Sequence, residues 1–138
     1  MVTATLPGDF GALLQAARQQ SEPQRLLFVF VRRELDESAT AAQRASFERG
    51  EGGHLQPCLC VDKLPDDIAS FAALVTESER TGQAWDIMFV AGIEGRGGIA
   101  PGSAEADRTL RAMINAINDG RIREFAAFDR EGFRISFV

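Results

Sequence analysis

The sequence predicts an α/β protein with a layered, mainly parallel β-sheet, flanked by helices and closed by a C-terminal antiparallel hairpin. Two observations predict it. Stretches with helical spacing of apolar residues alternate with short apolar runs of strand length, and helices that separate strands usually act as right-handed crossovers between parallel strands. The 138 residues fit one α/β domain, residues 1–138, which could bury about 68% of its unfolded surface.

The first helix is expected to begin at Asp9, a residue type that caps helices. Four apolar residues then share the i, i+3, i+4, i+7 spacing of one helix face: Phe10, Leu13, Leu14 and Ala17. The following stretch RLLFVFVRR, residues 25–33, is an almost continuous apolar run. Such a run is typical of a strand that is covered on both faces.

A shorter, alanine-rich helix is expected over residues 40–49, with Thr40 as its cap and GEGG as its end. The second strand is LQPCLCVDK, residues 55–63. Pro57 lies near its start, where the missing backbone donor is tolerated.

The third helix is predicted over residues 64–82. Pro65 suits its first turn, two aspartates complement its positive end, and Gly82 ends it. The third strand is AWDIMFVAGI, residues 84–93. These elements complete the strand–helix–strand pattern of a parallel sheet.

The C-terminal part begins with a helix from about Ser103 to Gly120. The sequence FDREGF then fits a type I turn, with Asp129 first and Gly132 fourth. Apolar and polar residues alternate after the turn, as in a one-sided antiparallel strand. We therefore expect a closing hairpin over residues 122–138.

Composition and charge narrow the function classes. A net charge of −5 argues against nonspecific nucleic-acid binding, which needs clustered cations, so no nucleic acid is expected as a partner. The longest apolar run, LLFVFV, is too short to span a bilayer, and no basic segment precedes an apolar one at the N-terminus. We expect a cytoplasmic protein without a signal peptide or a membrane partner.

A parallel sheet would gather charged residues at the carboxyl edge of its strands, where open α/β sheets bind ligands. Arg32 and Arg33 end the first strand, Lys63 ends the second, and Arg96 follows the third. The starts of the helices would direct backbone N–H groups at the same edge. This predicts an anion-binding site, although charges also appear wherever strands leave a core.

The glycine loop, residues 92–103, is the segment that most resembles a site. Its sequence GIEGRGG matches neither the P-loop nor the dinucleotide fingerprint. Gly95, Gly97 and Gly98, around Arg96, nevertheless allow a ligand to approach the backbone closely. The alternative is a loop that only connects a strand to the next helix.

Cysteine and histidine residues give little support for a metal site. Cys58 and Cys60, two apart in a strand, are expected to point to one face, and His54 precedes them. Zinc sites usually have four ligands with recognisable spacing. Two small thiols in a reducing compartment are the simpler interpretation, so we expect no metal and no cofactor.

Several phrases along the chain, among them PQRLLFVFV, FERGEGG, VDKLPDD and FDREG, are similar to a family of short bacterial proteins. Its members are often labelled "ribonucleotide reductase subunit alpha". The resemblance covers most of the chain and implies no particular activity. A reductase large subunit resembles a far longer barrel with a radical-forming cysteine and a redox-active cysteine pair. We therefore expect no reductase catalysis here.

The leading hypothesis is a noncatalytic binding or accessory module. It would recognise a protein partner or a small anionic ligand at the carboxyl edge of the sheet. The alternative is an enzyme acting on a phosphorylated or carboxylated small molecule through the glycine loop, with Asp62 or Glu94 as general base. A third possibility is a homodimer formed through the exposed edge of the C-terminal hairpin.

Overall fold

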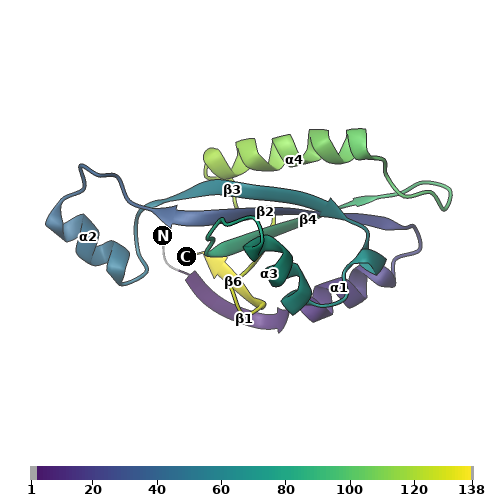
Figure 1. The fold of residues 1–138 in the computed structure, drawn as a ribbon, viewed down its shortest axis with the longest axis horizontal. Helices are drawn as coiled ribbons and strands as arrows, with labels where there is room; N and C mark the ends of the chain where they lie inside the picture. Colours follow the sequence, from purple (N-terminus) through teal and green to yellow (C-terminus); the bar gives the residue numbers. More distant parts are fainter. Residues whose placement is uncertain (1–2, 138) are drawn as a thin grey trace.

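The computed structural model describes residues 3–137 and shows one six-stranded sheet with the strand order β1-β6-β5-β4-β2-β3 (Figure 1). Every neighbouring pair of strands is antiparallel. The elements follow one another along the chain as β1 (Thr3–Asp9), α1 (Phe10–Arg18), β2 (Gln24–Glu34), α2 (Ala41–Glu48), β3 (His54–Lys63), η1 (Pro65–Asp67), α3 (Phe71–Glu79), β4 (Ile87–Glu94), α4 (Ser103–Asn118), β5 (Ala126–Phe128) and β6 (Phe133–Phe137).

The prediction of a mainly parallel sheet is wrong, and α2 is one reason. Helix α2 does not cross the sheet but lies beyond its end, so the chain turns back and β3 pairs antiparallel with β2 (Figure 1). No residue of α2 is buried. The helix is therefore an insertion in a β-hairpin and not a crossover.

The second connection explains why the pattern was misleading. Helix α3 leads from β3 to β4, and these two strands do run in the same direction. However, β2 lies between them and runs opposite to both. The parallel strands are thus separated by an antiparallel one, and no two neighbours are parallel.

The core has two layers, one on each face of β2. Leu27, Val29 and Val31 pack on the face that α4 covers, whereas the alternate residues pack on the face covered by α1 and α3. All six residues from Leu26 to Val31 are buried. Covering on both faces produces the continuous apolar run, and it does so whatever the direction of the neighbouring strands.

Some predicted helix boundaries are confirmed and one is wrong. The side chains of Asp9 and Thr40 accept backbone N–H groups as helix caps. The helix predicted over residues 64–82 is instead a short 3-10 turn, an extended stretch at Ile68, and α3 beginning after the cap Ser70. Ile68 is buried beneath this break. Its burial, and not the helix-start signal at Pro65, therefore determines the backbone here.

The C-terminal turn is confirmed, because the Gly132 N–H donates to the Asp129 carbonyl at 3.2 Å and β5 pairs antiparallel with β6. Val138, the last residue of the predicted hairpin, lies outside the described residues, as do Met1 and Val2 of the N-terminus. Strand β1, which the sequence did not predict, pairs with β6 on its other side. Within residues 3–137, no helix combines the length and apolar character needed to cross a membrane.

One buried hydrogen bond joins α3 to the segment that leads into β4. The indole Nε1 of Trp85 donates to Ser78 Oγ at 2.9 Å, and both residues are buried. Ser78→Ala leaves the indole N–H without a partner, so we expect the free energy of unfolding to fall by about 1–3 kcal/mol. Urea denaturation followed by tryptophan fluorescence measures this loss.

The matched control is Ser103→Ala, an exposed serine, for which we expect a change within about 0.5 kcal/mol. Equal stabilities of the two variants would contradict the role given to Ser78.

Candidate functional site

The antiparallel sheet separates the cations that the sequence placed at one edge. Arg32 and Arg33 lie opposite Gln56 and Leu55, at the end where β3 begins. Lys63 ends β3 at the other end of the sheet, the end from which Arg96 follows β4. The prediction of a single anion-binding edge depended on a parallel sheet. The antiparallel sheet does not bring these four side chains together.

The two arginines at the α2 end already have partners in the chain. Arg32 Nε lies 3.2 Å from a Glu34 carboxylate oxygen. The Arg33 guanidinium lies 4.4 Å from the centre of the Phe47 ring. The Arg33 contact ties α2 to the end of β2, and the Arg32 contact lies within β2 itself, so a structural role accounts for both side chains.

The glycine loop is a β-hairpin. Arg96 and Ile99 exchange two backbone hydrogen bonds, each 3.0 Å long. Gly97 and Gly98 between them have φ of 59° and 82°, as a type I′ turn requires. Figure 1 shows this turn projecting beyond the end of the sheet opposite α2.

The backbone of this hairpin is already occupied by groups of the same chain. The Gly98 N–H donates to a Glu22 carboxylate oxygen at 2.9 Å, and the Gly95 N–H donates to the Pro23 carbonyl at 2.8 Å. Gly95 is required because a Cβ there would collide with the Ile99 carbonyl. The glycines therefore serve the turn and its packing, and the anion beside Gly98 is the chain's own Glu22.

The two candidate general bases have different environments. Asp62 forms an ion pair with Arg25 at 2.8 Å, and the same guanidinium donates to the Pro101 carbonyl at 2.7 Å. Glu94 is exposed. Asp62 thus anchors the start of α4 to the end of β3, and neither carboxylate lines any of the described cavities.

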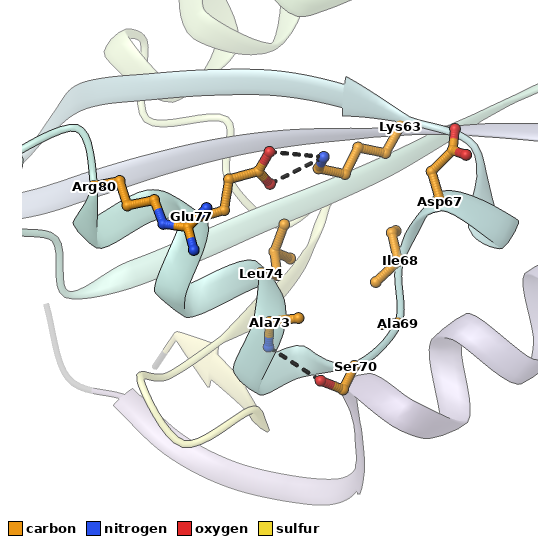
Figure 2. Close-up of a pocket in the computed structure, with 9 residues that line it drawn as sticks. All are labelled: Lys63, Asp67, Ile68, Ala69, Ser70, Ala73, Leu74, Glu77 and Arg80. Atoms are coloured by element: carbon orange, nitrogen blue, oxygen red, sulfur yellow. Dashed lines mark hydrogen bonds and ion pairs between the residues drawn. The ribbon is translucent and has the colours of Figure 1, made fainter.

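A groove lies between β3 and α3, and we call it the β3–α3 groove. It consists of two adjoining cavities of about 220 and 180 Å³ that share Leu74 and Glu77. The smaller cavity is mainly apolar and lies against β2, β3 and α3, with these residues in its walls: Phe30, Leu59, Val61, Leu74 and Thr81. The larger cavity carries these charged residues: Lys63, Asp67, Glu77 and Arg80 (Figure 2).

An ion pair spans the groove where the two cavities meet. Lys63 Nζ, from the end of β3, lies 3.0 and 2.9 Å from the two carboxylate oxygens of Glu77 on α3 (Figure 2). The Lys63 side chain is 18% exposed and the Glu77 side chain 51%. A ligand that binds Lys63 would have to displace Glu77 from this pair.

The outer side of β3 is a free strand edge. The Gly95 N–H donates to the carbonyl of Pro23, so odd-numbered residues along β2 direct their backbone groups at β4. The even-numbered residues of β2 therefore direct their backbone groups at β3. Val61 lies opposite one of them. The N–H and C=O groups of Cys60 and Asp62, on either side of Val61, therefore point away from the sheet. No hydrogen bond from residues 3–137 reaches these outward groups.

A larger hollow of about 660 Å³ lies between α2 and the loop before β3. Its α2 side is formed by Ala42, Gln43 and Ser46, on a helix that has no buried residue. A surface built on such a helix is less rigid than one built on β3 and α3, so the β3–α3 groove is the stronger candidate.

The two cysteines do not share a face, contrary to the prediction from their spacing. The register of β3 on β2 shifts between Leu59 and Pro57, which adds one residue to β3 there. Cys58 packs with the core on the α3 side, and its thiol donates to the Phe30 carbonyl at 3.4 Å. Cys60 is exposed. No cluster of three or more potential metal-ligating side chains occurs in the described part of the chain.

Comparisons with known proteins identify no relative: no family model, no curated protein and no solved structure matches the chain. The resemblance noted from the sequence therefore stays an expectation. Sequence reasoning also missed the groove, since its residues carry no motif. The only signal was Pro57, which favours an edge strand.

The hairpin gives a test of the glycine assignment. Gly95→Ala places a methyl group against two backbone carbonyls, so we expect a loss of about 2–3 kcal/mol in the free energy of unfolding. Gly92→Ala, where the methyl group meets only ordinary contacts, is the control and should change stability by less than about 0.5 kcal/mol. Chemical denaturation measures both, and similar losses would refute the assignment.

The cysteines give a second test. Burial raises the pKa of the Cys58 thiol, so near pH 8 it holds less reactive thiolate than an ordinary thiol. We expect iodoacetamide to label Cys60 at least about tenfold faster than Cys58. Mass spectrometry of peptides from a time course gives the two rates, which should converge in concentrated guanidinium. Faster labelling of Cys58 in the folded protein would contradict this placement.

Proposed function

We propose that the protein is a noncatalytic binding module that recognises a protein partner by accepting one extended segment of it along β3. The segment adds a strand to the sheet through the outward backbone groups of Cys60 and Asp62. Its side chains on one face enter the β3–α3 groove. The cytoplasmic location expected from the sequence is part of this proposal.

The observation that carries the proposal is the meeting of a free strand edge with an apolar groove. Cys60 lines the smaller cavity, although it lies opposite Val29, whose side chain faces α4. The cavity therefore reaches the β3 backbone from its free side. Main-chain hydrogen bonds supply affinity in strand addition, and adjacent pockets supply specificity.

The chemistry at the groove supports binding and not catalysis. Its charged residues include the mutually paired Lys63 and Glu77, and Ser70 caps α3 by accepting the Ala73 N–H at 3.0 Å. His54, the only histidine, is not among the residues that line the groove. A small anion would have to displace Glu77 from Lys63, whereas a strand needs no such displacement at the apolar cavity.

Selection from a displayed library of random peptides tests the proposal. We expect the selected peptides to bind as strands, so that amide hydrogen exchange of Cys60 and Asp62 slows on peptide addition. Nuclear magnetic resonance on the labelled protein reads out both amides directly. Peptides that leave both amides unprotected and shift residues elsewhere, or a library that yields no binder for a monomeric chain, would refute the proposal.

A matched pair of variants sharpens the test. Val61→Lys introduces a charge into the apolar cavity, so we expect the affinity for a selected peptide to fall at least about tenfold, which is about 1.4 kcal/mol. Phe133→Lys, at a position that is 52% exposed and does not line the groove, should change affinity by less than about twofold. Isothermal titration gives both values, and equal affinities would exclude this cavity as the binding site.

A further inference from the structure

We infer that the strand accepted by β3 is the β3 of a second copy of this chain, in a two-fold symmetric dimer. This inference rests on the proposed function, because it requires the same free edge. A two-fold dimer pairs one surface with itself. The argument therefore depends on whether β3 and its surroundings are complementary to themselves.

One short antiparallel register satisfies the outward backbone groups of both Cys60 and Asp62. Toward the start of β3, Pro57 lacks an N–H and the register shift interrupts the strand. Cys60 and Asp62 are left as the outward residues in the regular part of the strand. Pairing Cys60 of each copy with Asp62 of the other satisfies all these outward groups, and it places the two-fold axis at Val61.

The side chains of β3 fit this register. Val61 meets its own copy on the axis, and Leu59 of each copy lies opposite Lys63 of the other. Leu59 and Val61 line the apolar cavity, so pairing would join the apolar cavities of the two copies into one continuous floor across the axis. Each copy would then contribute one α3 wall, and the complete groove would need both chains.

The position of α4 supplies an independent argument. Helix α4 packs over both β2 and β3. Neighbouring strands lie about 4.8 Å apart, so two α4 helices related by the axis would lie about 10 Å apart. Packed helices are typically separated by 8–10 Å. Strand pairing would therefore bring α4 into contact with its copy without moving either helix.

The exposed surface of α4 has compatible charges for this contact. Asp107 and Arg111 are exposed and lie one helical turn apart. The inferred dimer places this side of α4 beside the axis, so that in an antiparallel helix pair each residue approaches the opposite charge on the other copy.

Light scattering after size exclusion tests the dimer on the native chain. We expect a mass of twice 15.0 kDa that Val61→Lys reduces to one chain and Phe133→Lys does not. A native chain that stays monomeric up to millimolar concentration overturns the inference.

Disulfide cross-linking tests the register in a background with Cys58→Ser and Cys60→Ser. Val61→Cys places two thiols on the axis, where facing Cα atoms lie about 4.5 Å apart and a disulfide can form. Leu59→Cys is the matched control, because its thiols would be about 13 Å apart along the strands. Cross-linking is expected only for Val61→Cys, and equal cross-linking of both variants overturns the register.

These outcomes distinguish the inference from the proposed function. If the chain is a monomer and selected peptides protect its Cys60 and Asp62 amides, the proposed binding function stands and the self-pairing is rejected. A monomer that binds no peptide at β3 removes both.

Discussion

Strand β2 is the constraint on which the rest of the structure depends. Its residues from Leu26 to Val31 are buried on both faces, so the strand must have helices above and below it and a strand on either side. β3 and β4 supply these two neighbours. Because both run opposite to β2, the directions of the central strands are fixed together, and α3 has to cross β2 to connect its neighbours.

This arrangement also determines where charged residues can act. With neighbouring strands antiparallel, the residues that follow them are divided between two ends of the sheet. Each end uses its charges locally, as Arg32 with Glu34 at the α2 end and Arg25 with Asp62 at the opposite end show. In the described part of the chain, the sheet therefore has no rim that gathers Arg32, Arg33, Lys63 and Arg96, and the β3–α3 groove lies at a side of the sheet.

Strand β3 forms an edge of the sheet, and only part of this edge is regular enough to pair with another strand. Free strand edges promote unwanted pairing, and proteins shorten them with prolines and bulges. Pro57 and the register shift have this effect in the first half of β3. The second half stays regular beside an apolar groove. A short edge of this kind favours one specific register over indiscriminate association.

The sequence by itself determined most elements: the caps Asp9 and Thr40, the three central strands, and the turn from Asp129 to Gly132. These depend on the order of neighbouring residues, which periodicity and turn chemistry record. Tertiary structure decided strand direction, the pairing of β1, the break before α3 and the β3–α3 groove. Burial on both faces gives the same apolar run in parallel and antiparallel sheets. Direction depends instead on where the chain returns after α2, and the groove on residues brought together only by folding.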